Sequence, residues 1–207
     1  GEVPPWDEQR VEIALKADKP GLRRLGLRMA ESLPKMPSGL IAAAEDPDQK
    51  VRLQAAFTLG EFKDDTAGKA LAAIARRDGA NPYIAAAVLS SAIPHYRALV
   101  ERAEHLSEIL VLGLLKMSKR DPESARKLTE GLLARRSGAE KWRLLAAVPA
   151  DYRAKVRELA LGVIADKRRD EEERIAVIGL LGKSDAELLA EFLGAGNSTK
   201  LQAAAIS

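Results

Sequence analysis

The chain has 207 residues, of which 46% are hydrophobic and only 4% aromatic, and its 33 Lys and Arg against 30 Asp and Glu give a net charge of +3. This composition is typical of helices packed through small aliphatic side chains and argues against an all-β domain. The near balance of charge argues against an obligate nucleic-acid binder, the absence of cysteine excludes disulfides and thiolate metal sites within these residues, and no apolar run is long enough to cross a membrane.

The first predicted helix is DKPGLRRLGLRMAESL, residues 18–33. Apolar residues recur in it at helical spacing and are expected to form one buried face. They are Leu22, Leu25, Met29 and Leu33.

The clearest helix signal is DPDQKVRLQAAFTLGEF, residues 46–62, in which Asp46 can cap the helix and Pro47 suits its first turn. One apolar face consists of Val51, Ala55, Leu59 and Phe62. A neighbouring face adds Leu53, Phe57 and Gly60. The widened apolar stripe predicts a helix buried between two layers of a repeat protein.

A second helix pair follows directly. Residues 66–79, TAGKALAAIARRDG, predict an antiparallel partner helix that ends at a glycine. The next helix begins in NPYIAAAVLSSA, where Asn81 can cap and Pro82 sits in the first turn. Because Ile84 follows Val51 by 33 positions (84 − 51), the spacing matches a HEAT-like helix pair.

The middle of the chain, residues 93–150, is helical but loses this period. HLSEILVLGLLKM and DPESARKLTEGLLARR predict two helices, with loops at 118–121 and 137–140. Because no Gly/Ser-rich or Pro-rich linker interrupts the chain, we expect divergent helix pairs rather than a separate domain.

Two later segments repeat the pattern, DEEERIAVIGLLG and NSTKLQAAAIS. The residues expected to define the repeat are Asp46, Pro47, Arg52, Gly60, Pro82, Arg174 and Gly182. Arg52 and Arg174 share a repeat position and are expected to pair with aspartates of neighbouring turns. The sequence therefore predicts an all-α fold of about a dozen helices, in which residues 1–207 form a single α-solenoid domain of HEAT-like pairs. The start without Met and the end within an apolar helical pattern suggest a fragment of a longer protein.

The segments DPDQKVRLQAAFTLGEF, ALAAIARRDGANPYIAAAVLSSA and ERIAVIGLLGKSDAELLAEFLGAGNSTKLQAAAIS resemble the HEAT-like repeat region of large bacterial dehydrogenase and cytochrome c-type proteins common in planctomycetes and verrucomicrobia. In that family the repeats usually lie between a β-propeller and a cytochrome c domain of an exported protein. The resemblance implies a periplasmic or exported location. The family's haem needs a Cys-x-x-Cys-His motif, and a chain without cysteine has no residue that matches a haem ligand.

No residues form a recognisable catalytic or metal-binding motif. His95 and His105 do not share a helix face, and the acidic loop at 61–65 lacks the glycine and final glutamate of a calcium loop. Ser90 and Ser91 are not preceded by a nucleophile elbow. We therefore expect no catalytic residue, no metal and no cofactor.

Arginine doublets recur along the chain, mostly near predicted helix C-termini, where positive charge suits the helix dipole. Aligned on one wall, they could instead contact an acidic partner or phosphates. The candidate interaction surface consists of Arg76, Arg77, Tyr83, Arg135, Arg136, Trp142, Arg168 and Arg169. Trp142 has two interpretations, because it either packs in the core or forms an exposed hot spot.

The leading hypothesis is a non-enzymatic HEAT-repeat scaffold that binds a protein partner or the flanking domains of its own parent chain. The alternative is a nucleic-acid-binding module similar to HEAT-like DNA glycosylases. A lyase-type repeat protein acting on a bilin is a third and weaker option. Membrane insertion is not expected.

Overall fold

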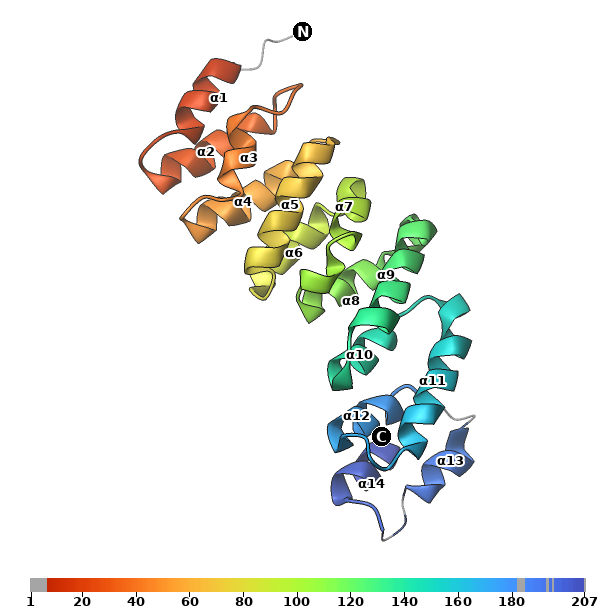
Figure 1. The fold of residues 1–207 in the computed structure, drawn as a ribbon. Coiled ribbons are helices and arrows are strands. Elements are labelled where there is room, and N and C mark those ends of the chain that lie inside the picture. Colours follow the sequence, from red (N-terminus) through yellow and green to blue (C-terminus); the bar gives the residue numbers. More distant parts are fainter. Residues whose placement is uncertain (1–6, 182–184, 193, 195, 207) are drawn as a thin grey trace. The chain divides into compact units, whose positions relative to one another are not determined.

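The computed structural model describes residues 7–181, 185–192, 194 and 196–206, and this part of the chain is helical and contains no strand (Figure 1). The predicted all-α fold is therefore confirmed. The chain divides into two compact units, residues 1–124 and 125–207. Gly182, predicted as a repeat-defining residue, lies outside the described residues.

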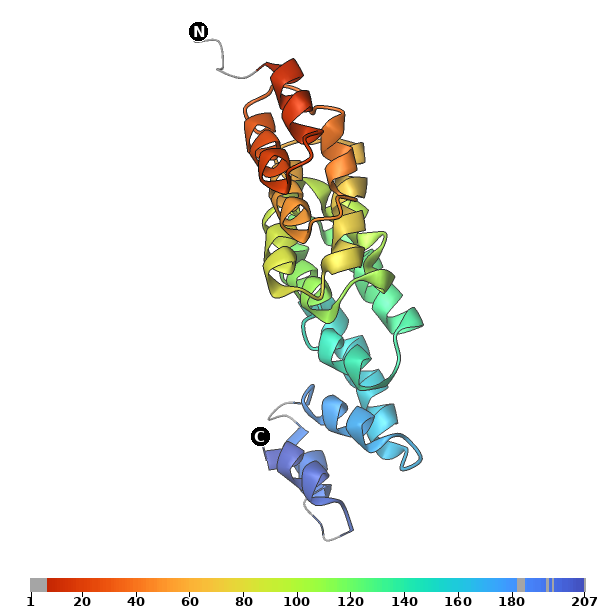
Figure 2. The same cartoon turned by 90° about the vertical axis from the view of Figure 1, so that its left-hand side faces the viewer.

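The first unit contains eight α-helices among its described residues: α1 (Glu8–Leu15), α2 (Pro20–Ala30), α3 (Gly39–Ala43), α4 (Gln49–Leu59), α5 (Asp65–Asp78), α6 (Pro82–Ser90), α7 (Tyr96–Val100) and α8 (Glu108–Lys116). Three short 3₁₀ helices are η1 (Ile93–His95), η2 (Ala103–His105) and η3 (Ser118–Arg120). The even-numbered helices α2, α4, α6 and α8 pack side by side in one row, and α1, α3, α5 and α7 form a second row against them (Figure 2). We call these the even row and the odd row.

The second unit is described by itself. Its elements are α10 (Gly138–Leu145), η4 (Ala150–Tyr152), α11 (Arg153–Ala165), α12 (Glu171–Ile178), α13 (Ala186–Glu191) and α14 (Thr199–Ile206), and α9 (Pro122–Arg135) runs into it from the first unit. Helix α12 packs against both α10 and α14. The loop predicted at 137–140 is wrong, because α10 already begins at Gly138 there.

A long polar side chain at the fourth residue of several helices holds the loop or helix end that precedes it. Arg23 in α2, Arg52 in α4, Lys141 in α10 and Gln202 in α14 all occupy this position. Each donates to backbone carbonyls just before its own helix; the acceptors are Ala17 and Asp18, Asp46 and Pro47, Leu133, and Gly194 and Asn197, respectively. Carbonyls at helix connections often lack a partner within the helix, and these side chains supply a donor. In each case the side chain fixes the position of the segment that leads into the helix.

In the first unit the same arginines also bind an aspartate further along the chain. Arg23 makes two hydrogen bonds to Asp46, at 2.6 and 2.9 Å, and Arg52 makes two to Asp78, at 2.6 and 2.7 Å. Such two-point guanidinium–carboxylate pairs are the strong form of the ion pair. The expected pairing of Arg52 with an aspartate is thus present. The series ends at α6, whose fourth residue is Ala85.

The capping role predicted for Asp46 is wrong. Asp48 caps α4 through hydrogen bonds from the amides of Lys50 and Val51, and Pro47 lies before the helix instead of in its first turn. The carboxylate of Asp46 is occupied by Arg23, which explains the difference. For α6 the cap at Asn81 and the position of Pro82 in the first turn are as predicted.

The face of the even row that points away from the odd row is not buried. Leu22, Leu25 and Phe57 were expected in the core, yet each is more than two-fifths exposed. The core face of α2 is formed instead by Gly26, Leu27, Met29 and Ala30. Helix α4 therefore packs against α2, α6 and the odd row, and its remaining face is exposed instead of being covered by a further layer.

Glycines at helix ends allow close packing here rather than a left-handed turn. Gly60 ends α4 with a φ of −65°, and Gly138 is the only glycine with positive φ in the described residues. A Cβ atom on Gly60 would lie 2.5 Å from Ser91 Oγ and 2.6 Å from Ser91 Cβ. Gly60 therefore does not form a left-handed stop, and α4 needs glycine there because α6 ends against it.

Replacing Gly60 with alanine is expected to lower the free energy of unfolding by about 1–3 kcal/mol, because the added methyl group overlaps Ser91. Urea unfolding measures the change. The matched control is Gly131→Ala in α9, where a Cβ would meet nothing within 4 Å. There alanine should raise stability by about 0.5–1 kcal/mol, since it favours the helix. Equal effects at both positions would refute the packing argument.

Candidate functional site

Exposed apolar side chains collect on the outer face of the even row. We call this set the apolar strip: Leu22 and Leu25 of α2, Phe57 of α4, Tyr83 of α6 and Ile109 of α8. Tyr83 is 75% exposed, and the others are between 44% and 49% exposed. Single exposed apolar residues are ordinary, but a series carried by four adjacent helices indicates a contact surface.

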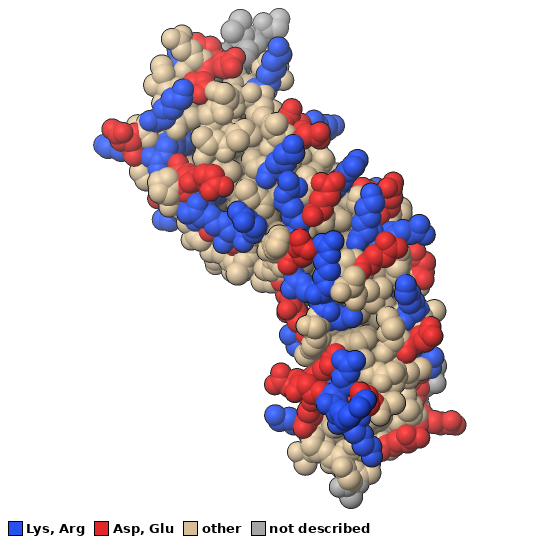
Figure 3. Space-filling model, viewed as in Figure 1, with Lys and Arg blue, Asp and Glu red and all other residues tan. Residues whose placement is uncertain are grey.

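Two helices of the odd row, α5 and α7, expose mainly charged residues. The exposed residues of α5 include Asp65, Lys69 and Arg76, and α7 exposes Arg97 and is followed by the exposed C-cap residue Glu101. On the face seen in Figure 3, basic and acidic side chains are interspersed with uncharged surface and do not gather by sign. Charge therefore dominates the exposed surface of α5 and α7, whereas α1 of the same row exposes Ile13, and Ile93 is exposed in η1.

A groove of about 660 Å³ opens where three even-row helices end. Arg28, Phe57 and Ser90, each the ninth residue of its helix, line it. The C-cap residues Glu31, Gly60 and Ser91 line it as well, together with Gln54 and Glu61. The groove is thus built from equivalent positions of α2, α4 and α6, and the C-terminal ends of the three helices meet there.

Hydrogen bonds between α2 and α4 hold one wall of the groove in place. Arg28 Nε donates to Gln54 Oε1 at 3.3 Å, and Gln54 Nε2 donates to Glu31 Oε1 at 3.1 Å. The buried hydroxyl of Thr58 donates to the same Glu31 oxygen at 2.7 Å. The Glu31 carboxylate is therefore fixed in position by two donors.

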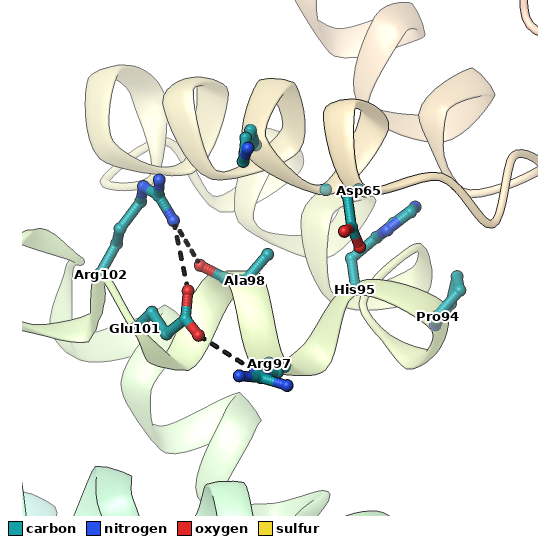
Figure 4. A pocket seen from close by; sticks show the side chains of 9 residues that line it. Asp65, Pro94, His95, Arg97, Ala98, Glu101 and Arg102 are labelled. Carbon is teal, nitrogen blue, oxygen red and sulfur yellow. Dashed lines mark hydrogen bonds and ion pairs between the residues drawn. The ribbon is translucent and has the colours of Figure 1, made fainter.

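A smaller cavity of about 280 Å³ lies in the odd row, between α5 and the η1–α7 segment (Figure 4). His95 is buried beside it, and its Nε2 lies 3.0 Å from the carbonyl oxygen of Leu59. Since a carbonyl only accepts, Nε2 carries the proton. Figure 4 shows the Asp65 side chain beside the His95 ring, while Glu101 binds Arg97 and Arg102. His95 thus connects η1 to the C-terminal end of α4.

The serines and the second histidine serve local structure. Ser90 Oγ donates to the Ala87 carbonyl, and Ser91 Oγ donates to the Phe57 carbonyl. His105 is exposed and lies 3.2 Å from Glu104. The hydroxyls of the two serines and the ring of His95 are engaged with separate backbone carbonyls.

The acidic loop before α5 also has a structural role. Asp64 caps α5 by accepting from the amides of Thr66 and Ala67, and these hydrogen bonds, with one from the Thr66 hydroxyl, lower the pKa of its carboxyl. Within the described residues, no group of three or more His, Asp or Glu side chains is placed to hold a metal ion.

The residues of the candidate surface predicted from the sequence are divided between the two units. Trp142 is only 3% exposed, so it packs in the core of the second unit and does not belong to an exposed surface. Tyr83 is exposed and belongs to the apolar strip. The arginine doublets are distributed over both units; Arg76 and Arg77 end α5, Arg135 and Arg136 follow in α9 and its end, and Arg168 and Arg169 precede α12.

Several of these arginines have nearby carboxylates. Arg136 pairs with Glu140 at 2.5 Å, and Arg77 lies 3.6 Å from Glu45. Arg168 binds Asp166, which also lies 3.9 Å from Arg169. Their charge is therefore partly offset locally, as expected for exposed helix ends.

Arg174 departs from the pattern of Arg52. It is buried at the fourth position of α12, where its guanidinium lies 5.7 Å from the centre of the Phe192 ring. Its Nε has no hydrogen-bond partner. The expected pairing with an aspartate is therefore wrong for Arg174, and the contact with Phe192 takes its place.

Sequence reasoning missed the polar residues of the groove. Arg28, Glu31 and Gln54 look like ordinary solvated positions, because a periodicity pattern records only which face is apolar. The available signal was Phe57, a large aromatic residue placed off the main apolar face of its helix. An exposed aromatic at such a position indicates a contact surface.

Comparison with known proteins gives no assignment. No protein-family model matches the chain, and neither a curated protein nor a solved structure matches it. Among the described helices, none has the length and apolar character needed to cross a membrane.

Proposed function

We propose that the chain is a HEAT-like α-solenoid that acts as a non-enzymatic scaffold, and that it binds a protein partner through the apolar strip of the even row. The observation that carries the proposal is the series of exposed apolar side chains on four adjacent helices, α2, α4, α6 and α8. Protein contact surfaces are enriched in such aromatic and aliphatic residues.

A recurring hydrogen-bond pattern also supports a repeat scaffold. The fourth-residue donors recur in α2, α4, α10 and α14, which suits helix pairs written several times along one chain. In stacked helix pairs, one helix of each pair forms a continuous surface that can display side chains to a partner. The resemblance to the repeat region of exported bacterial redox proteins stays a prediction.

Site-specific photo-crosslinking in the source cells tests the proposal. A photoreactive amino acid is placed at Phe57 in the apolar strip and, as the matched control, at Lys69 on the exposed face of α5. We expect a discrete crosslinked protein from position 57 and none from position 69. No crosslink from position 57, or the same products from both positions, would refute the proposal.

A further inference from the structure

The groove at the ends of α2, α4 and α6 shows what kind of partner side chain the apolar strip accepts. Its lining contains one cation, Arg28, and two carboxylates, Glu31 and Glu61. Arg28 Nε is engaged with Gln54, whereas neither Glu31 nor Glu61 forms an ion pair among the described residues. Two carboxylates against one cation leave the groove with a formal charge of −1.

The helix ends add to this negative character. Glu31, Gly60 and Ser91 are the C-cap residues of α2, α4 and α6, and all three line the groove. The C-terminal end of a helix carries a partial negative charge from its unpaired carbonyls, which favours cations. Three such ends therefore act in the same direction as the two carboxylates.

Phe57 provides a surface for the aliphatic part of a side chain. Its ring is 44% exposed and lines the groove between the carboxylate-bearing ends of α2 and α4. The face of an aromatic ring attracts a cation, and the methylene stem of Lys or Arg packs well on an apolar surface. A neutral side chain would gain only the apolar packing, and an acidic one would lack the attraction between a cation and the ring.

The position of Glu31 is fixed before any partner arrives. Gln54 and Thr58 both donate to its Oε1, which leaves Oε2 available as an acceptor. A carboxylate that is already held costs less conformational entropy to engage than a free one. The groove is thus organised in advance for a positively charged group.

We propose that the groove binds the Lys or Arg side chain of a partner polypeptide, with the stem on Phe57 and the charge between Glu31 and Glu61. The proposal rests on the proposed function, because it names the chemistry of the partner at one place on the apolar strip. Leu25 of α2 and Tyr83 of α6 are further exposed apolar residues on the helices that flank α4. The recognised segment therefore carries a basic residue with apolar neighbours.

Selection from a displayed library of random linear peptides on the full chain tests this inference. We expect the enriched peptides to carry a Lys or Arg beside apolar residues. The double variant Glu31→Gln, Glu61→Gln should bind the best of them about tenfold more weakly, and Phe57→Leu about threefold more weakly. Binding should also weaken with added salt.

The control is Glu101→Gln, which removes one exposed carboxylate from α7 in the odd row and should leave binding unchanged. Enriched peptides without basic residues, failure to enrich any peptide, or binding unaffected by the double variant would each overturn the proposal. Such a result combined with a crosslink from position 57 alone would reject the groove chemistry and keep the scaffold. Absence of that crosslink would reject the scaffold itself.

Discussion

Replacing Asp78 with alanine is expected to lower the free energy of unfolding by about 3–5 kcal/mol. The side chains of Asp78 and Arg52 are 7% and 6% exposed, and the carboxylate accepts two hydrogen bonds from the guanidinium. Removal of the carboxylate leaves a buried cation whose charge is no longer balanced. Urea unfolding gives the size of the loss, and amide hydrogen exchange should place it in α4 and α5.

The matched control is Glu45→Ala, which breaks the exposed pair between Glu45 and Arg77. That pair is separated by 3.6 Å and both side chains are at least two-fifths exposed, so its loss should cost less than about 0.5 kcal/mol. A similar cost for both variants would show that the Arg52–Asp78 pair has no special weight.

The pH dependence provides a second readout of the same pair. Hydrogen bonding to Arg52 lowers the pKa of Asp78 below its ordinary value in the folded chain. A lowered folded-state pKa contributes stability above the unfolded pKa of about 3.9, and this contribution is lost as the pH falls through the folded value. The stability difference between the wild type and Asp78→Ala should therefore be full at pH 7 and decrease below about pH 4.

Trp142→Ala is expected to destabilise the second unit by about 3–5 kcal/mol. The indole is buried against α12, and its Nε1 donates to Glu173 Oε1 at 2.9 Å. Truncation leaves a cavity and also removes a hydrogen bond from a buried carboxylate. The change is measured by urea unfolding followed by circular dichroism, with hydrogen exchange in α10 and α12 locating it.

Two variants separate the sources of that effect. Trp142→Phe keeps most of the apolar volume but not the N–H donor, and should cost about 1–3 kcal/mol. Tyr83→Ala removes an aromatic ring that is 75% exposed and should change stability by less than about 0.5 kcal/mol. If Trp142→Ala were as mild as Tyr83→Ala, the assignment of Trp142 to the core would be wrong.

Periodicity was sufficient to predict the helices and most of the buried positions. Val51, Ala55 and Leu59 are fully buried, as their spacing indicates, and α5 occupies almost the predicted residues. The cap at Asn81 also follows from the sequence, because an Asn-Pro start needs only local contacts. Local preference and local geometry agree at these positions.

Long-range contacts explain the errors. Asp46 looked like a cap because its sequence neighbourhood suits one, but Arg23, 23 positions earlier, binds its carboxylate. Leu25 and Phe57 were expected to be buried, because the apolar character of a residue does not show whether another helix covers it. The groove was missed for the same reason, since Glu31 and Glu61 come together only when α2 and α4 pack.

Asp46 also shows how neighbouring helix pairs depend on one another. Its carboxylate binds Arg23 of α2, while its backbone carbonyl accepts a hydrogen bond from Arg52 of α4. Asp46 thus takes part in the contacts of both arginines, so fraying of α2 or of α4 weakens the hydrogen bonds that hold the other helix. In a repeat protein this is a coupling between nearest neighbours. We therefore expect the helices from α2 to α5 to unfold together.

Beyond Asp78 the fourth residues of α6 and α8 are Ala85 and Val111, and the directed contact at this connection is instead the hydrogen bond from Ser107 Oγ before α8 to the carbonyl of Gly79, at 2.6 Å. A neutral hydrogen bond stabilises less than a buried ion pair, so we expect the coupling to weaken there.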